Sequence, residues 1–204
     1  MVESVRATAA SDVEILCYVT HDDHSYDYQS WPIRFINGPR LVMSDLWNAL
    51  LPHANGDIFM QCADDVLFRT PRWDRYVEEA FAWQPDRILL VHGHDLHPNG
   101  ENFGTLPFVS RAWVEAIGYF TGPGFAVDFS DTWPNDVANL IGRRRYLPLV
   151  FEHCHWLWGK SEMDETYQEM QDLRLKEGLA ITSSYAERLP ERQADAEKLR
   201  KVMR

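Results

Sequence analysis

The sequence has few cysteines, no long apolar run and no recognisable leader, and each of these absences excludes a class of protein. Its three cysteines, among 204 residues, are Cys17, Cys62 and Cys154; they are widely spaced and each lies in an apolar stretch, which argues against a disulfide framework. No apolar run approaches the roughly 18 residues that a membrane span needs. The N-terminal MVESVRATAAS lacks the charged and apolar regions of a signal peptide. We therefore expect a soluble, cytoplasmic protein.

Positive charge is also scarce, because 20 basic residues face 31 acidic ones and give a net charge of −11. This balance argues against a broad phosphate-binding surface, which needs clustered Lys and Arg. One local basic cluster, residues 143–145, remains, and a solvated helix end explains it at least as well. The sequence contains no complete GxxxxGKS/T phosphate loop, no GxGxxG turn and no GxSxG elbow. Phosphate binding would therefore have to go through a metal ion.

The hydrophobic fraction of 45% and the chain length are sufficient for one main domain with a buried core. Short apolar runs alternate with segments of helical periodicity, and this alternation predicts an α/β fold with a largely parallel sheet. We expect strands at 13–19, 33–38, 58–62, 87–95, 104–110 and 147–156, and helices at 2–10, 42–54, 71–84, 111–120 and from 131–135 onward. From about residue 161 the composition is strongly charged. This predicts a domain over 1–160 and a helical extension over 161–204.

Two adjacent carboxylates, Asp64 and Asp65, interrupt the apolar stretch GDIFMQCADDVLF at the end of an expected strand. Burying unpaired acids beside apolar neighbours is costly, so a cation should meet them. Carboxylates are hard oxygen ligands that suit Mg²⁺ or Mn²⁺. The alternative is an ordinary turn or a helix N-cap.

Histidines follow the last expected strand in FEHCHW. Strand alternation places His153 and His155 on one face, where two imidazoles could hold a metal ion; a partly exposed pair without a ligand is the alternative. Three further histidines, His92, His94 and His97, have a spacing that fits no defined metal site, and we expect them to line a pocket at most.

Further acids lie at a helix start and in a polar loop. Asp131 and Asp136 flank the start of a helix, where either could be an N-terminal cap or a general base that faces a substrate. Asp22 and Asp23, in the loop THDDHSYD, could accept hydrogen bonds from a nucleotide base or ribose, or could form an ordinary polar turn. The sequence leaves both pairs of alternatives open.

Taken in order, the blocks GDIFMQCADDV, FVSRAWVEAIGYF and DTWPNDVANLIGRRRYLPLVFEHCHW resemble a GT-A-fold glycosyltransferase of the family 2 type, including short versions encoded by bacteriophages. The resemblance covers roughly residues 13–156. It implies a GT-A-like sheet in which Asp65 is a metal ligand and Asp64 contacts the ribose or metal-bound waters. Ala63 stands where many members have the first Asp of the motif. His153 or His155 resembles the histidine that completes the metal and diphosphate site.

The resemblance also assigns roles to the other acids. Asp131 or Asp136 would be the catalytic base, with Asp131 favoured, and Asp22 and Asp23 match the loop that recognises the nucleotide base. Arg40 and Asn48 lie in the segment that usually packs near that base. The first strand of the family pattern is missing from this chain, so we expect an exposed strand edge that could pair with a second copy.

The implied activity is an inverting, Mn²⁺- or Mg²⁺-dependent transfer of a sugar from a nucleoside diphosphate sugar to an acceptor hydroxyl. The acceptor could be a modified DNA base, a protein or a glycan, and a phage enzyme would act in the host cytoplasm. Two alternatives remain: a catalytically degenerate module that binds a sugar nucleotide, or a hydrolase of nucleotide sugars.

Overall fold

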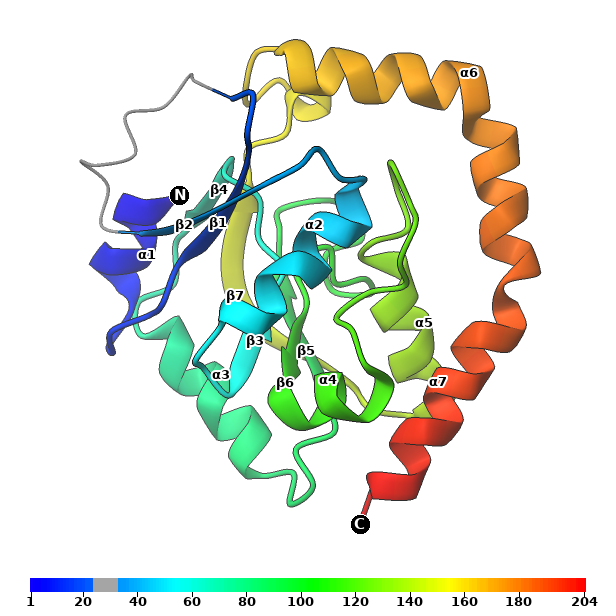
Figure 1. The fold of residues 1–204 in the computed structure, drawn as a ribbon. Coiled ribbons are helices and arrows are strands. Elements are labelled where there is room, and N and C mark those ends of the chain that lie inside the picture. The colour runs from blue at the N-terminus through cyan, green and yellow to red at the C-terminus, as the bar shows by residue number, and fades with distance from the viewer. Residues whose placement is uncertain (24–32) are drawn as a thin grey trace.

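The structure is a computed structural model that describes residues 1–23 and 33–204, and it has an α/β architecture (Figure 1). A small parallel sheet pairs β1 (Leu16–Thr20) with β2 (Arg34–Gly38). A second sheet has five strands, in the spatial order β3 (Ile58–Met60), β6 (Phe108–Ser110), β5 (Leu90–His94), β7 (Arg144–His153) and β4 (Val66–Phe68). The predicted fold class is thus confirmed at the level of α/β.

The expectation of a largely parallel sheet is wrong for the five-stranded sheet, which is mixed. Only β5 and β7 pair in parallel, whereas β6 runs antiparallel to both β3 and β5, and β4 runs antiparallel to β7. The reason lies in the connections, because parallel neighbours need a crossover, usually through a helix. The link from β5 to β6, residues 95–107, contains no helix, and the chain returns antiparallel beside the strand that it has just left.

Seven α-helices surround the sheets in the described part of the chain. They are α1 (Val2–Thr8), α2 (Met43–Leu50), α3 (Trp73–Ala82), α4 (Arg111–Ile117), α5 (Thr132–Ile141), α6 (Glu165–Glu187) and α7 (Leu189–Val202), with short 3₁₀ turns η2 (Leu51–His53) and η3 (Trp156–Trp158). Ser110 caps α4 by accepting a hydrogen bond from the Trp113 amide. Thr70, a hydroxyl residue just before α3, does not cap this helix; its hydroxyl oxygen accepts from the Val150 amide of β7.

Two residues of the basic cluster that the sequence suggested as a solvated helix end, Arg144 and Arg145, belong to a strand instead. Helix α5 stops at Ile141, Gly142 follows in the left-handed conformation that commonly ends a helix, and β7 begins at Arg144. Arg143 lies 3.3 Å from the carboxylate of Asp86.

The core lies on both faces of the five-stranded sheet, and strand alternation divides the side chains between them. Leu90 and Val109 point to a cluster under α4, α5 and α7, whereas Val91 and Phe108 point to a cluster under α1 and α3. The tightly packed aromatic group Phe68, Trp73, Phe108 and Phe151 fills the second cluster. Both faces of the sheet are therefore covered, and function can gather only at its ends and edges.

The small sheet and the five-stranded sheet border one cavity. Among the described residues, β1 and β3 each pair with a strand on one side only, and segments from both strands line a cavity of about 480 Å³ together with Val13, Ile15 and Trp73. The single continuous sheet that we expected is therefore divided into two.

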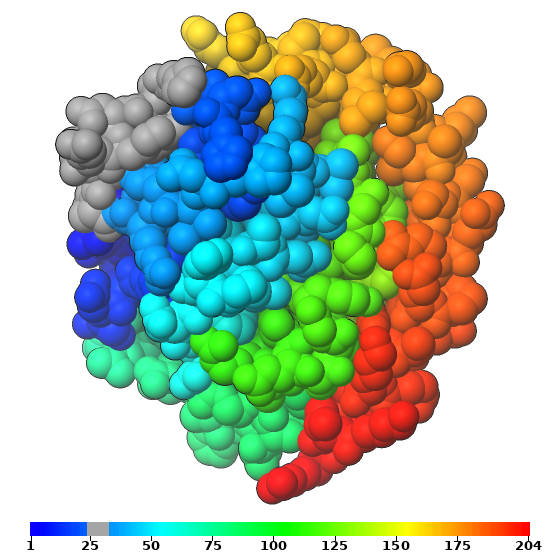
Figure 2. Space-filling view, viewed as in Figure 1, coloured from blue at the N-terminus to red at the C-terminus, as the bar shows by residue number. Residues whose placement is uncertain are grey.

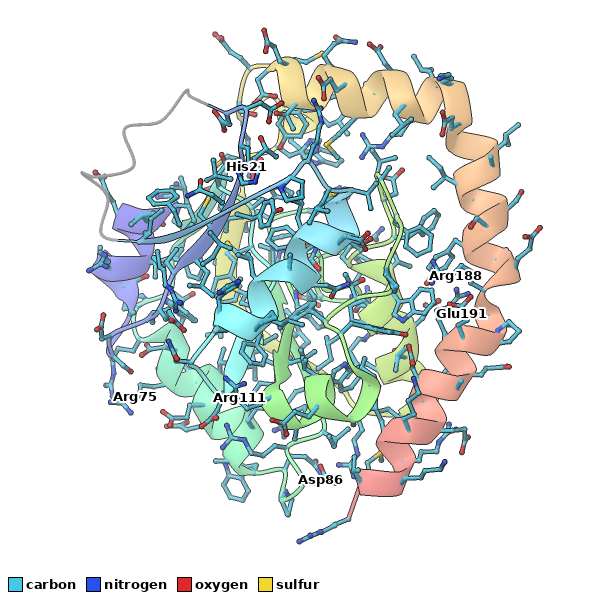
Figure 3. All side chains as sticks on the ribbon, viewed as in Figure 1. His21, Arg75, Asp86, Arg111, Arg188 and Glu191 are labelled. Carbon is cyan, nitrogen blue, oxygen red and sulfur yellow. The ribbon has the colours of Figure 1, made fainter. Side chains whose placement is uncertain are left out.

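The last two helices run across the top and then down the right side of the molecule in the view of Figures 1 and 2. Helix α7 packs closely, since Ala196 and Leu199 are fully buried among residues of α4 and α5. At the junction of α6 and α7, Arg188 pairs with Glu191 and stacks over Trp133, as Figure 3 shows for the two labelled residues. No helix in the described ranges is long and apolar enough to span a membrane.

Candidate functional site

The adjacent acids lie on a segment that crosses the end of the five-stranded sheet. β3 and β4 are its two outer strands, so the short link from Gln61 to Asp65 runs from one edge of the sheet to the other. Pairing of β4 with β7 then sets Val66 opposite His153, and the Cys154 amide donates to the Asp65 carbonyl at 2.8 Å. This register explains why the apolar run is interrupted at this point, and it places Asp65 beside the histidines at the end of β7.

The carboxylate of Asp65 has one partner at each oxygen. Oδ1 lies 3.2 Å from Nε2 of His153, and Oδ2 accepts a short hydrogen bond from the Tyr167 hydroxyl. Burial alone would raise the pKa of Asp65, but the contacts with His153 and Tyr167 outweigh it and hold the pKa below its ordinary value. Asp65 is therefore ionised at neutral pH.

The pair Asp65 and His153 fits a divalent cation. Oδ1 of Asp65 is buried and forms no hydrogen bond, although Nε2 of His153 lies within ion-pair distance. Neighbouring ligands in an octahedral Mg²⁺ or Mn²⁺ site lie about 3.0 Å apart, close to the 3.2 Å between these atoms. The described residues contain no cluster of three or more candidate ligands. Water or substrate oxygens would therefore have to supply the remaining ligands.

His155 lies beside His153 but has a different role in the local structure. β7 ends at His153, so the predicted strand through residue 156 is too long, yet the two rings remain in edge-to-face contact at 5.2 Å. Nδ1 of His155 caps η3 by accepting from the Leu157 amide. Burial, and then the neighbouring His153, lower the pKa of His155, which keeps this ring neutral at pH 7.

Asp131 occupies the N-cap position of α5 without capping the helix through its side chain, so the cap interpretation is wrong. Its Oδ1 accepts a hydrogen bond from the Thr132 hydroxyl at 3.1 Å. Burial raises the pKa of Asp131 to about 6. Just before it, Asp128 and Phe129 both have φ near +58°, in the left-handed region that side chains disfavour. Backbone strain of this kind is common at functional sites.

A single cavity of about 790 Å³ brings half of the predicted site residues together. It is lined by Asp64, Asp65, Asp131, His153 and His155. The same wall includes three side chains that sequence reasoning missed, Asp128, Tyr167 and Arg174. The sequence DFSD offered a signal for Asp128, an acid close to a helix start. Tyr167 and Arg174 had no such signal, because they belong to a charged helix distant in sequence from the other residues.

Three other predicted residues lie outside the lining of this cavity. The Asp136 carboxylate accepts a hydrogen bond from the Tyr185 hydroxyl and lies 3.3 Å from Arg192. The amide of Asn48 is occupied with the backbone of residues 120 and 121. Arg40, which is largely exposed, pairs with Glu169 of α6. Of the two candidate bases, only Asp131 faces the cavity.

Asp22 and Asp23 lie in the turn that follows β1, and residues 24–27 of the same polar loop lie outside the described residues. Neither of these two carboxylates lines the cavity. The pKa of the Cys17 thiol is raised by burial first and then by the charges of Asp64 and Asp23. Both carboxylates thus lie close enough to Cys17 for their fields to act on it.

The three other histidines, which we expected to line a pocket at most, do not line this cavity. His92 is buried in β5, where desolvation lowers its pKa. Nδ1 of His94 accepts from the Leu96 amide, and His97 packs edge-on against Trp158 at 4.3 Å. These contacts support the loop between β5 and β6.

We compared the chain with models of protein families, with curated proteins and with solved structures, and none of them matched. The proposal below therefore depends on the residues and on the geometry of the site.

Proposed function

We propose that the chain is a metal-dependent glycosyltransferase that transfers a sugar from a nucleoside diphosphate sugar to an acceptor hydroxyl with inversion. One observation carries the proposal: the acids after β3, the histidines after β7 and the acid at the start of α5 all line one cavity. They belong to the first and third of the three sequence blocks on which the resemblance to GT-A-fold enzymes depends. They lie far apart in the sequence, and nothing in their local structure requires them to converge.

Asp131 has the properties of a general base in this scheme. A base works best when its pKa lies near the pH of the reaction, and a carboxyl with a pKa of about 6 is mostly ionised at pH 7 while still accepting a proton effectively. It would take the proton of the acceptor hydroxyl as the oxygen bonds to the anomeric carbon. As this bond forms, the bond from that carbon to the diphosphate breaks, and its electrons leave with the diphosphate.

Asp65 and His153 would hold the cation, and Asp64 and Asp23 would contact the donor. A bound Mn²⁺ or Mg²⁺ supplies positive charge that stabilises the departing diphosphate. Such a cation is needed because the cavity wall is rich in acids and Arg174, a cation in this wall, is already paired with Asp128. Without a metal ion, the carboxylates would repel an anionic donor.

Calorimetric titration of the chain with UDP, GDP and TDP, each with and without Mn²⁺, tests the proposal. We expect one nucleotide to bind only when Mn²⁺ is present, and Asp65→Ala to abolish this binding. Asp57→Ala is the matched control, because this acid precedes β3 but its side chain is 78% exposed and pairs with Arg111. Binding that is indifferent to Asp65 would contradict the proposed donor site.

Turnover then separates the remaining alternatives. Release of free sugar at the same rate with and without acceptors would indicate a hydrolase. Metal-dependent binding without either reaction would indicate a degenerate binding module.

A further inference from the structure

Helix α6 contacts the proposed cation site through its first turn. The Asp164 carboxylate caps the helix by accepting from the Tyr167 amide at 2.8 Å, which fixes where this residue lies. The Tyr167 hydroxyl donates to Oδ2 of Asp65, and its ring packs edge-on against His155 at 4.6 Å. A residue of the C-terminal helical segment therefore completes the surroundings of the central carboxylate.

A second polar contact holds the same half of α6 to the cavity. The guanidinium of Arg174 forms a fork on the Asp128 carboxylate, with distances of 2.8 to 3.1 Å. Beyond this point the side chains of Leu175 and Leu179 are largely exposed, and the helix returns to the core only near its end, where Tyr185 is buried. Figure 1 shows α6 running along the outside of the molecule. The first half of α6 is thus attached to the body chiefly through residues of the site.

We propose that Tyr167 is a positioning residue for the cation: its hydroxyl fixes the Asp65 carboxylate so that Oδ1 and Nε2 of His153 face one metal ion. This inference rests on the proposed function, because it assumes a cation at Asp65. The hydroxyl binds only Oδ2 and leaves the buried Oδ1 without a hydrogen bond, 3.2 Å from the histidine nitrogen.

The physical reason is preorganisation. A carboxylate free to rotate about its side-chain bonds loses conformational freedom when it binds a metal ion, whereas one already held by a hydrogen bond loses less. Outer partners of metal ligands orient those ligands in this way, and removing them typically weakens metal binding roughly 10- to 100-fold. Tyr167 has the geometry of such a partner, although it comes from an element that sequence reasoning treated as an extension.

Titration with Mn²⁺ alone, followed by calorimetry and by electron paramagnetic resonance, tests this inference without any substrate. We expect Tyr167→Phe to weaken Mn²⁺ binding roughly 10- to 100-fold while the protein stays folded. Tyr76→Phe is the matched control, because this tyrosine is half-exposed on α3, and it should leave the affinity unchanged. Arg174→Met loosens the same half of α6 but keeps the phenol, so its effect should be much smaller.

The outcomes separate this inference from the proposed function. Mn²⁺ binding that depends on Asp65 but is unchanged or tighter in Tyr167→Phe would overturn the role of Tyr167 and leave the metal site intact. An equal loss of Mn²⁺ affinity in Arg174→Met would show that Mn²⁺ binding depends on the docking of the helix and not on the Tyr167 hydroxyl. This result would also overturn the inference. If wild type and Asp65→Ala both fail to bind Mn²⁺, the metal site itself is wrong, and the inference fails with it.

Discussion

At the scale of single residues, the carboxyl groups of the cavity differ because their neighbours differ. Asp65 has a histidine and a phenol as partners, and its pKa is lowered, whereas Asp131 has one hydroxyl partner, and burial raises its pKa to about 6. Neighbouring acids with divergent pKa values are typical of catalytic sites, where one binds a cation while the other moves a proton. Each environment is set by residues from other parts of the chain.

The raised pKa of Asp131 predicts how stability changes with pH. Because the folded chain holds this proton more tightly than the unfolded chain, the contribution to stability is complete below the ordinary value of 3.8 and is lost as pH rises through about 6. The asparagine in Asp131→Asn cannot ionise, so this variant does not lose stability as pH rises through about 6. Relative to wild type, we expect it to gain roughly 1–3 kcal/mol in free energy of unfolding between pH 4 and pH 7.5.

Urea unfolding of both proteins at the two pH values checks this expectation, and the difference between the two proteins removes the titration of all other groups. A stability gap that is the same at both pH values would contradict the raised pKa.

At the scale of elements, close backbone approaches decide how the strands meet. The parallel pairing of β5 and β7 shifts register between His92 and His94, where Gly93 lies. A Cβ atom at Gly93 would lie 2.6 Å from the Leu149 carbonyl oxygen and 2.6 Å from the Phe151 ring. The backbone oxygen cannot move aside without distorting β7, the strand that carries His153 to the cavity.

Gly93→Ala should therefore destabilise the fold by roughly 1–3 kcal/mol, as overpacking in a core does. Gly178→Ala provides the comparison, because no atom lies near its added Cβ and the residue is in the interior of α6. Glycine loses more conformational entropy on folding than alanine does. The change should therefore stabilise the helix by about 0.5–1 kcal/mol. Thermal unfolding of the two variants measures both effects, and equal melting temperatures would contradict the predicted contact at Gly93.

At the scale of the whole molecule, the two C-terminal helices have different structural roles. Helix α7 closes the core on the face covered by α4 and α5, with Leu199 fully buried and Asp195 accepting hydrogen bonds from Tyr119 and from the Trp133 indole at 3.1 Å. Helix α6 instead spans from the core to the cavity. Residues 161–204 thus contribute both to the packed body and to the candidate site.

This difference predicts unequal effects of two similar truncations. Leu199→Ala should cost about 2–5 kcal/mol in free energy of unfolding, since it leaves a cavity in the core. Leu179→Ala removes a side chain that is 89% exposed on α6 and should change stability by less than about 0.5 kcal/mol. Urea unfolding measures both, and a small loss for Leu199→Ala would mean that α7 is dispensable to the core.

Sequence reasoning placed most elements but misjudged the sheet and several contacts. Periodicity located β2, β3, β5 and the helices α3 and α4 to within a few residues, because burial imposes periodic apolar positions on the sequence, but it predicted no strand at β4. It could not show the direction of the strand pairs, which depends on the route of the links between strands. For the same reason it could not show that Thr70 bonds to β7, or that Asn48 is occupied with the loop after α4.

The sequence by itself determined the α/β class, the main apolar faces and the chemistry available at Asp64, Asp65, Asp131 and the two histidines after β7. These properties are local, because they depend on side-chain type and on spacing along the chain. Only the tertiary structure decided which of these residues meet. It places Asp131 in the lining of the cavity and Asp136 outside that lining. It also brings Tyr167 of α6 into hydrogen-bonding contact with Asp65. Pairs separated by dozens of residues meet because sheet register and helix packing place them, and neither is encoded in any short stretch of sequence.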